Sequence, residues 1–469
     1  MSNSPLYSSM KCLKRQLLRT QAAASLLVIL LCASCALAQG ISNSAKQLER
    51  AAALISENRI DEAEQQLSAI LKATPNNALA LNLLGAIRAK QQRLDEAEAL
   101  FTRALGIDKE FLGAHMNLAY LYLLKGVPDK SISELREVLR LDPNNPDVSY
   151  KLARLLLSQG RADESIAVVE QMKQRQSLPP PFLVVLGDAY LKKGDTAKAE
   201  ESYLLAVNQQ SNSADALMGL ALLSQAKGDS QNAVLYLNRT RDLINGSPER
   251  LYSFARLALN SGLIEDALAT LKRATELKAD EPRYHFLYGL AWLQKPDLQE
   301  AEQAFRRLLK LQPENAQGQL YLGYVLLKQK KSAEAREWLE KSLQKETGAP
   351  ETFYYLGLIA QEQSEDERAV EFFEKSIRLA PRFASAHIAL GATYLKLKDF
   401  PRAQAALEAG VKLKPDDSRA HYNLALLYAR LKDQKRAQEE MHIVEQLKSA
   451  GKAEDKEGEI LAPSTPSPK

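Results

Sequence analysis

The chain has 469 residues and carries 62 lysines and arginines against 58 aspartates and glutamates, with the whole excess of positive charge in its N-terminal segment 1–38. The rest of the chain balances its charges, which argues against a nucleic-acid-binding protein, because such proteins need a concentrated basic face. All three cysteines also lie in segment 1–38, so the rest of the chain can hold neither a disulfide framework nor thiolate metal ligands.

Segment 1–38 has the three parts of an export signal. Four basic residues between positions 11 and 19 precede an apolar run at 22–31, and the segment ends on Ala36-Leu37-Ala38. This order of charge, apolar run and small residues is typical of a secretory signal peptide. We therefore expect residues 1–38 to be a signal peptide cleaved after Ala38, with the rest of the chain exported to the periplasm or secreted.

Two other interpretations of this leader stay open. Cys35, preceded by Cys32-Ala33-Ser34, resembles the lipidated cysteine of a bacterial lipobox, which would make a membrane-attached lipoprotein. The apolar run is alternatively an uncleaved anchor, although it is short for a membrane span. Because positively charged flanks stay in the cytoplasm, all three interpretations export the rest of the chain.

A small residue then recurs at every thirty-fourth position, twelve times without interruption. It is alanine or serine, and a second small residue, alanine or glycine, stands twelve positions before each one. A fixed period of this length indicates a stacked array of similar supersecondary units. The first series is Ala63, Ala97, Ser131, Ser165, Ala199, Ala233, Ala267, Ala301, Ala335, Ala369, Ala403 and Ala437, and the second is Ala51, Gly85, Ala119, Ala153, Gly187, Ala221, Ala255, Gly289, Gly323, Gly357, Gly391 and Ala425.

Each period contains two apolar patterns at helical spacing. In residues 78–111, Leu81 and Leu84 mark a first helix, and Ala97 and Phe101 mark a second. Intervals of three and four place such residues on one face of a helix. The small residues let the two helices of a pair approach closely, since a larger side chain there would overpack the contact.

The breaks between these helices carry residues that end and start helices. Within five consecutive periods the break holds a glycine, which suits the left-handed residue that closes a helix. Between periods, segments such as Pro75-Asn76-Asn77 stop one helix with proline and cap the next with asparagine. Any bending is expected at Leu178-Pro179-Pro180-Pro181 or Asn245-Gly246-Ser247-Pro248, although simple capping is the alternative there. The five glycines are Gly126, Gly160, Gly194, Gly228 and Gly262.

Together these residues resemble the tetratricopeptide repeat family. The family's pattern is aromatic, leucine, glycine and tyrosine on a first helix, then alanine, aromatic, alanine and proline on a second. The resemblance implies an all-α fold, an α-solenoid forming a right-handed superhelix, with the first helices lining an inner groove. Residues 180–213 show the pattern through Leu186, Gly187, Tyr190, Ala199, Tyr203 and Ala206.

The predicted array covers residues 44–451, and residues 452–469 follow it. Their three prolines, scattered charge and low apolar content predict a disordered tail. The twelve predicted units are 44–77, 78–111, 112–145, 146–179, 180–213, 214–247, 248–281, 282–315, 316–349, 350–383, 384–417 and 418–451.

We find no catalytic or metal-binding pattern in the array. No HExxH, P-loop or GxSxG motif occurs, and breaks of a few residues leave no long loops from which an active site could converge. Four of the five histidines take the fourth position of a first helix and are interpreted as packing residues. We therefore expect no enzyme, cofactor, metal, small-molecule substrate or nucleic acid. Those histidines are His115, His285, His387 and His421.

Positions two, five, six and nine of each unit are predicted to face the inner groove and are rich in aromatic and basic side chains. Tyrosine and arginine often anchor protein interfaces, although several of these tyrosines could instead pack between adjacent first helices. The predicted partner-binding residues are Asn117, Tyr120, Tyr150, Lys151, Arg154, Tyr252, Arg256, Phe286, Tyr321, Tyr324, Tyr354, Tyr355 and Tyr422.

The sequence therefore predicts an exported scaffold that binds proteins or peptides. The resemblance favours envelope assembly or the secretion of polysaccharide or pili. An alternative is a chaperone or chaperone adaptor that grips peptide tails, because Asn117, Lys151 and Arg154 echo part of the family's carboxylate clamp. A regulatory fragment of an enzyme is a remote third possibility.

Overall fold

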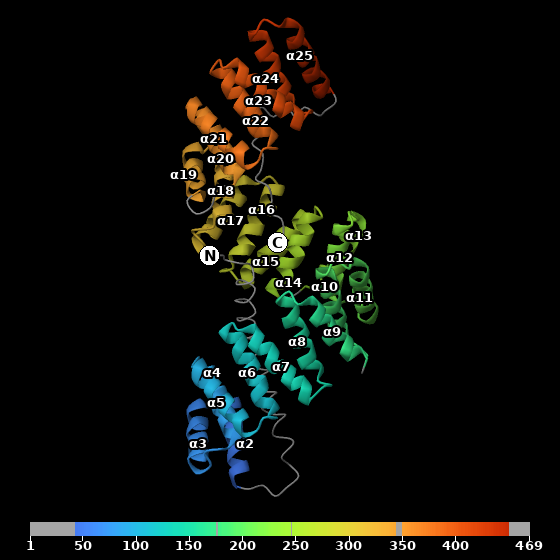
Figure 1. Cartoon of the computed structure of the whole chain (residues 1–469), viewed down its shortest axis with the longest axis vertical. Coiled ribbons are helices and arrows are strands. Elements are labelled where there is room, and N and C mark those ends of the chain that lie inside the picture. The colour runs from blue at the N-terminus through green and yellow to red at the C-terminus, as the bar shows by residue number, and fades with distance from the viewer. Residues whose placement is uncertain (1–42, 175–176, 245, 344–348, 450–469) are drawn as a thin grey trace. The chain divides into compact units, whose positions relative to one another are not determined.

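The chain forms helices throughout the part that the computed structural model describes, namely residues 43–174, 177–244, 246–343 and 349–449. Twenty-four α-helices and no strand occur in these residues (Figure 1). The predicted all-α solenoid is thereby confirmed. The predicted signal peptide and the predicted disordered tail both lie outside the described residues. Within the described part, no helix combines the length and the apolar character needed to cross a membrane.

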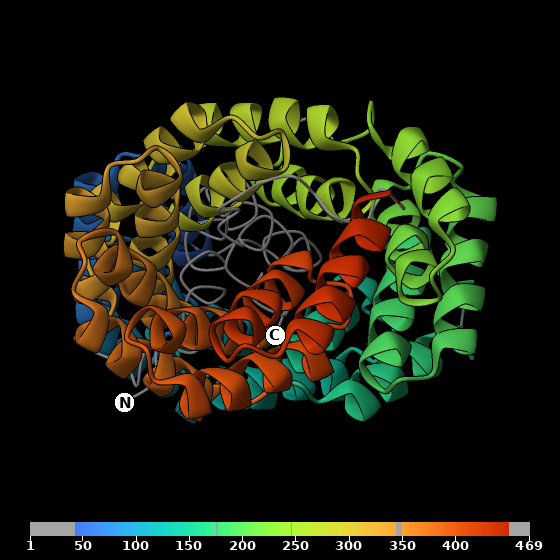
Figure 2. The same ribbon diagram turned by 90° about the horizontal axis from the view of Figure 1, so that it is seen from above.

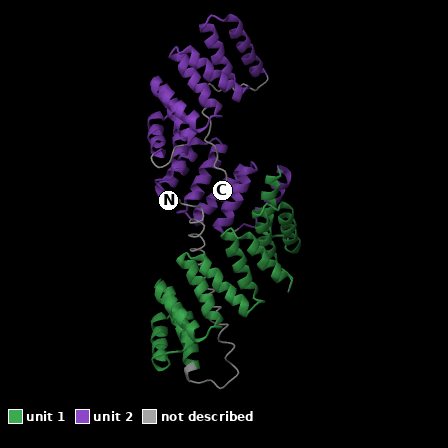
Figure 3. Ribbon diagram, in the orientation of Figure 1, with its two compact units in different colours: residues 1–227 green, residues 228–469 purple. Residues whose placement is uncertain are grey.

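Two compact units divide the chain, unit 1 ending at Lys227 and unit 2 beginning at Gly228 (Figure 3). This division does not coincide with either of the two breaks at which bending was expected. Pro180 and Pro248 instead begin helices, where proline is tolerated because its missing N–H would have had no intrahelical partner.

The helices of unit 1 are α2 (Asn43–Ser56), α3 (Ile60–Ala73), α4 (Ala78–Lys90), α5 (Leu94–Ile107), α6 (Leu112–Lys125), α7 (Pro128–Leu141), α8 (Pro146–Ser158), α9 (Ala162–Lys173), α10 (Pro180–Lys192), α11 (Thr196–Gln209) and α12 (Ala214–Ala226). Those of unit 2 are α13 (Ser230–Thr240), α14 (Pro248–Asn260), α15 (Ile264–Leu277), α16 (Pro282–Gln294), α17 (Leu298–Leu311), α18 (Ala316–Lys328), α19 (Ser332–Ser342), α20 (Pro350–Glu362), α21 (Asp366–Leu379), α22 (Ala384–Lys396), α23 (Phe400–Leu413), α24 (Ser418–Arg430) and α25 (Gln434–Ser449).

Even-numbered helices are the first helices of the pairs, and odd-numbered helices are the second helices. Within a unit, a first helix packs against its own second helix, as α6 does with α7, and against the second helix before it, as α6 does with α5. First helices also contact one another, as α4 does with α6. The yellow-green and yellow helices of unit 2 show the resulting two rows (Figure 2). A first helix inside a unit therefore has neighbours on several sides, and only part of its surface faces solvent.

The closest approach within a pair is made by the small residue of the first helix. A Cβ atom placed on Gly187 would lie 2.5 Å from Cε1 of Tyr203 on the facing helix, and one placed on Gly219 of the next first helix would lie 2.5 Å from Cζ of the same ring. The ring of Tyr203 is fully buried between them. The predicted need for small residues at the helix contact is confirmed.

The size of this small residue depends on the size of the side chain sixteen positions later in the sequence. All four aromatic residues at the later position face glycine, whereas leucine, valine or methionine is preceded by alanine or, twice, by glycine. The two side chains therefore share one space, and a larger one requires a smaller partner. The four aromatic pairs are Gly85–Phe101, Gly187–Tyr203, Gly289–Phe305 and Gly357–Phe373.

A residue with positive φ closes the first helix of every described pair. The five predicted glycines have φ between 73° and 79°, as expected. In the other pairs this position has no glycine, so the sequence did not reveal it. Six of these pairs place a left-handed residue there, with φ between 59° and 65°, and an L-residue other than glycine costs about 1–2 kcal/mol in this conformation. The six residues are Asn58, Gln92, Lys330, Ser364, Lys398 and Lys432.

Asparagine caps the first helices that follow the proline-containing breaks. The side-chain oxygens of Asn77, Asn145 and Asn315 accept hydrogen bonds from backbone N–H groups three residues on, at 2.9, 3.1 and 2.7 Å. Each bond satisfies a donor that has no partner inside the helix. The predicted capping is confirmed at these three breaks.

The four histidines at position four of their units connect the turn before a first helix to that helix through a hydrogen bond. In each, Nε2 lies 2.8–3.0 Å from the backbone carbonyl six residues earlier, to which it donates when protonated there. Gln319 takes the same position and donates to the carbonyl of Pro313 at 2.7 Å. The histidines therefore have a structural role, as the sequence indicated. No cluster of three metal-ligating side chains occurs among the residues described.

Gly187→Ala is expected to lower the free energy of unfolding by about 1–3 kcal/mol, because the Tyr203 ring is held from both sides and cannot move aside. Urea unfolding followed by circular dichroism measures this loss. In a double-mutant cycle with Tyr203→Leu, the two changes should couple by at least about 1 kcal/mol. Gly106→Ala is the matched control, because a Cβ on this helical glycine meets no facing atom within 4 Å. A loss as large for Gly106→Ala as for Gly187→Ala would contradict the shared-space explanation.

Lys330→Gly is expected to stabilise the protein by about 0.5–1 kcal/mol, because glycine relieves the backbone strain at φ 65°. The opposite change, Gly160→Ala, should cost about 1 kcal/mol at φ 78° although its Cβ would meet no facing atom within 4 Å. Thermal unfolding of the two variants checks both signs. Equal shifts in the same direction would contradict a conformational cause.

Candidate interaction surface

Five of the predicted partner-binding residues come together on two successive first helices of unit 1. Asn117 and Tyr120 lie on α6, and Tyr150, Lys151 and Arg154 lie on α8. We call these five residues the α6–α8 surface. They share a face because they occupy positions five, six and nine of their units, and those positions recur on one side of a helix.

Lys151 joins the two helices of the α6–α8 surface. Its Nζ donates to the hydroxyl of Tyr120 at 2.6 Å, lies 5.3 Å from the centroid of that ring, and forms an ion pair with Asp147. Partial burial lowers the pKa of Lys151, but the Asp147 carboxylate and the Tyr120 hydroxyl outweigh it and raise the pKa overall. The ammonium group is therefore charged but already engaged within the chain.

Asn117 is engaged in the same way. Its Nδ2 donates to Oδ1 of Asn82 on α4 at 2.9 Å, and both side chains are at least partly buried. The sequence analysis did not select Asn82, although this residue takes the fifth position of its unit. With Asn117 and Lys151 both committed to internal partners, the clamp-like arrangement of the sequence is not free to grip a carboxylate.

Arg154 differs from its neighbours because its guanidinium group is available. The side chain is exposed, and its Cζ lies 5.6 Å from the centroid of the Tyr150 ring. That ring packs in turn against Phe182 of α10, with centroids 5.5 Å apart. Among the described residues no carboxylate lies within ion-pair distance of Arg154. A cation held over an aromatic ring, without a carboxylate at ion-pair distance, is well suited to bind an acidic group.

Asp188 on α10 adds a carboxylate whose charge acts on Arg154. It is exposed and accepts a hydrogen bond from the hydroxyl of Tyr203 at 2.6 Å. The surrounding helices restrict its hydration, and the Asp215 carboxylate adds repulsion, so its pKa rises to about 6 against the opposing effects of the Tyr203 hydroxyl and Arg154. The sequence analysis missed Asp188 because it selected aromatic and basic types. Asp188 takes the ninth position of its unit, as Tyr120 and Arg154 do in theirs, and this shared position is the signal that could have identified it.

In unit 2, the predicted residues on α14 and α16 are half-buried. The ring of Tyr252 stacks on Tyr284 of the next first helix with centroids 5.4 Å apart, and Cζ of Arg283 lies 5.0 Å from the Tyr252 centroid. Arg256 on α14 and Phe286 on α16 are each only partly exposed. The three predicted residues of this part of unit 2 are thus all partly buried, whereas the α6–α8 surface includes the exposed Arg154.

Four predicted partner-binding tyrosines are buried, and their prediction as surface residues is wrong. Tyr321, Tyr324, Tyr354 and Tyr355 are between 0% and 7% exposed. Their rings fill the space between successive first helices, as Tyr355 does with centroids 5.6 Å from both Tyr324 and Tyr354. Burial raises the pKa of Tyr354 to about 12. Packing between adjacent first helices, the alternative considered for these residues, is what the structure shows.

Tyr422 on α24 has the opposite environment. Its side chain is 47% exposed, although it occupies the same fifth position as Tyr150 and Phe286. Of the predicted residues, Arg154 and Tyr422 are therefore those with the most accessible side chains.

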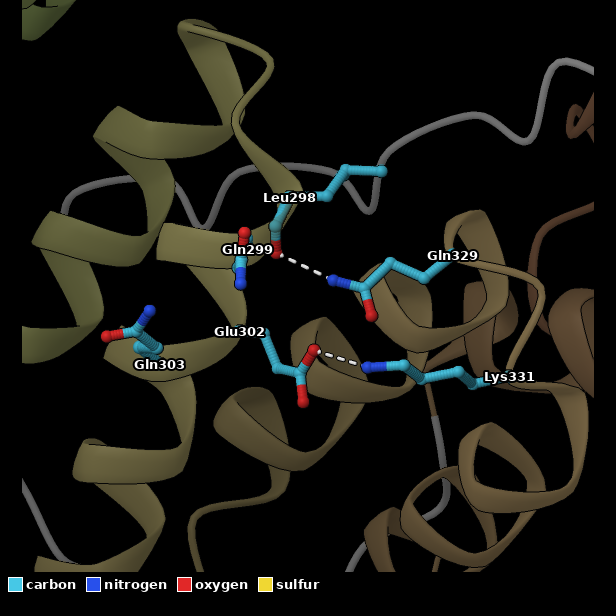
Figure 4. A pocket seen from close by; sticks show the side chains of 6 residues that line it. All are labelled: Leu298, Gln299, Glu302, Gln303, Gln329 and Lys331. Carbon is cyan, nitrogen blue, oxygen red and sulfur yellow. Dashed lines mark hydrogen bonds and ion pairs between the residues drawn. The ribbon is translucent and has the colours of Figure 1, made fainter.

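A hollow of about 560 Å³ lies on the second-helix side of unit 2 (Figure 4). Two pairs of polar groups in its wall form hydrogen bonds with each other. Lys331 donates to Glu302 at 2.9 Å, and Nε2 of Gln329 donates to the carbonyl of Leu298 at 3.0 Å. These contacts join α17 to the turn between α18 and α19, so they have a structural role.

Comparison with known proteins identifies the repeats. Two sequence profiles, both described as tetratricopeptide repeat, match most of the array. One matches residues 48–110, 184–248, 252–316 and 297–350, and the other matches residues 125–178 and 362–431.

Similarity to individual proteins is local. The chain is 28% identical over 172 residues to the mouse "Protein O-mannosyl-transferase TMTC3", covering 33% of this chain and 18% of that protein. It is 29% identical over 185 residues to "Cellulose synthase operon protein C" of Xanthomonas axonopodis pv. citri, covering 39% of this chain and 10% of that protein. The chain thus spans less than a fifth of the length of either relative.

Two solved structures also align with the chain. A tetratricopeptide repeat protein from Parabacteroides merdae has 17% sequence identity and a TM-score of 0.44, covering 53% of this chain and 98% of that one. A chain of the APC/C hetero-tetramer Cut9–Hcn1 has 14% identity and a TM-score of 0.45, covering 87% of this chain and 94% of that one.

Proposed function

This chain belongs to the tetratricopeptide repeat family, whose repeats form protein–protein interaction scaffolds, and we propose that its first-helix face binds a partner protein through the α6–α8 surface. The family's fold is generally a non-enzymatic scaffold. The proposal extends this to the present chain, because in its described part the accessible side chains lie in rows along helices.

The observation that carries the proposal is the state of Arg154. Its neighbours Lys151 and Asn117 are satisfied by contacts within the chain, whereas Arg154 is exposed, oriented by the Tyr150 ring and without an ion pair among the described residues. An oriented, unpaired arginine loses little entropy on binding. It is the side chain of this surface best prepared to anchor a peptide.

Arg154→Ala is expected to weaken peptide binding about tenfold or more, as for a central interface anchor. The probe is the strongest binder from an array of randomised twelve-residue peptides, titrated by fluorescence anisotropy. Arg136→Ala is the matched control, because Arg136 on α7 is equally an exposed arginine but pairs with Glu164. Unchanged affinity for Arg154→Ala, or the same loss for both variants, would contradict the assignment.

A chaperone adaptor that grips peptide tails is the second candidate, favoured by the placement of Asn117, Lys151 and Arg154 on two successive first helices. The internal bonds of the first two residues weaken it. The same titration separates the candidates, because a tail-gripping site requires the free C-terminal carboxylate. A peptide that loses most of its affinity when its C-terminus is amidated would favour the adaptor.

We further propose that the scaffold acts outside the cytoplasm, in envelope assembly or in the secretion of polysaccharide or pili. The support is the charge, apolar run and small-residue order of residues 1–38. The similarity of 185 residues to a protein named for a cellulose synthase operon agrees with polysaccharide secretion.

Protein purified from bacterial cells is expected to begin at Gln39, because cleavage after Ala38 satisfies the small-residue rule. Intact-mass analysis of the periplasmic and membrane fractions measures this. A mature chain that begins at Cys35 and carries an added lipid mass would show that the protein is a lipoprotein and not a secreted protein. Protein that stays in the cytoplasm with its leader intact would contradict export.

A further inference from the structure

The aromatic packing of unit 2 defines a socket between successive repeats. Tyr321, on first helix α18, packs against both Phe286 of α16 and Phe305 of α17, with ring centroids 5.5 Å and 5.4 Å away. Phe286 and Phe305 stand at positions five and twenty-four of their unit. The socket is therefore formed by one helix pair and filled by a side chain that comes after it in the chain.

In the last described pair the two equivalent socket positions are exposed. Tyr422 of α24 and Met441 of α25 stand at the same two positions and are 47% and 40% exposed. Leu426, one turn after Tyr422, is 39% exposed. No later helix covers them among the described residues, whereas Tyr321, the occupant of the earlier socket, is only 2% exposed. Apolar side chains at the end of a repeat array need a cover in water.

We propose that the segment after α25 covers this socket, with Ile460 and Leu461 as its anchors. These two are the only large apolar residues that follow Ser449 in the sequence. Every other residue of this segment is small, charged, threonine or proline. Ile460 and Leu461 are therefore the side chains of this segment suited to cover Tyr422, Leu426 and Met441.

The length of the connecting chain fits this contact. Met441 lies eight residues before Ser449 on α25, a helical distance of about 12 Å. Eleven positions separate Ser449 from Ile460 in the sequence, and a random-coil chain of that length has an average end-to-end distance of about 18 Å. Because the reach and the distance are similar, the tether holds the anchors near the socket at an effective concentration in the millimolar range.

Charge favours the same contact. Arg430 follows Tyr422 and Leu426 at intervals of four residues, so the three side chains form one row on α24. Arg430 is exposed, and no carboxylate of the described residues pairs with it. In the tail, Glu457 and Glu459 shortly precede Ile460. The apolar row on α24 ends in a cation, and the sequence of the tail places acidic residues directly before two apolar ones, so the two patterns are complementary.

A cysteine pair tests the contact in the full chain with Cys12, Cys32 and Cys35 replaced by serine. Met441→Cys combined with Leu461→Cys should form an intramolecular disulfide under mild oxidation, measured by intact mass and non-reducing electrophoresis. The control pairs Glu439→Cys with Leu461→Cys, because Glu439 is exposed on another face of the same helix. We expect at least tenfold faster crosslinking through position 441. Equal rates, or disulfides between two molecules, would overturn the proposal.

A second measurement does not depend on disulfide geometry. Alkylation of a single cysteine from Met441→Cys should be several-fold slower than that from Glu439→Cys, and Ile460→Asp with Leu461→Asp should remove this protection. Protection that persists with both aspartates and grows with protein concentration would overturn the proposal and assign the socket to a second copy. Equal alkylation of the two cysteines at all concentrations would also overturn it, by showing an open socket.

Discussion

The close contact between the two helices of each pair is the constraint on which the rest of this structure depends. A small residue on the first helix and a side chain sixteen positions later share one space, so glycine stands opposite every aromatic ring at that later position. This contact sets how near the helices lie, and the fixed period repeats it along the chain. A shift of one residue would place a larger side chain in that space and overpack it.

The packing of neighbouring helices against each first helix decides which of its side chains are accessible to a partner. Position six illustrates this, because Tyr321 is buried between neighbouring helices whereas Lys151 reaches the edge of the face and binds Tyr120. A bulky ring fills the gap between successive first helices and gains from burial. A charged group stays at the solvent edge, since burying it unpaired is costly. The free surface is therefore concentrated where charged residues interrupt the aromatic ones, as at Arg154.

The end of the described array shows how the same positions are exposed when no further helix covers them. A helix pair relies on the next first helix to cover its apolar positions, and α24 and α25 have no such helix among the described residues. Tyr422 and Met441 are exposed for this reason and not because their types differ from those of earlier pairs. In a structure built from nearest-neighbour contacts, position in the stack changes the environment of an otherwise equivalent residue.

The sequence by itself determined the helix pairs, their period, the close contact at residues such as Gly187, and the capping by Asn77, because these depend on local spacing and residue type. Only the tertiary structure decided which predicted residues are accessible. It buried Tyr321 and Tyr355, engaged Lys151 and Asn117 within the chain, and left Arg154 free. The reason is physical: period and residue type place a side chain on a face of its helix, whereas exposure depends on what the neighbouring helices put against that face.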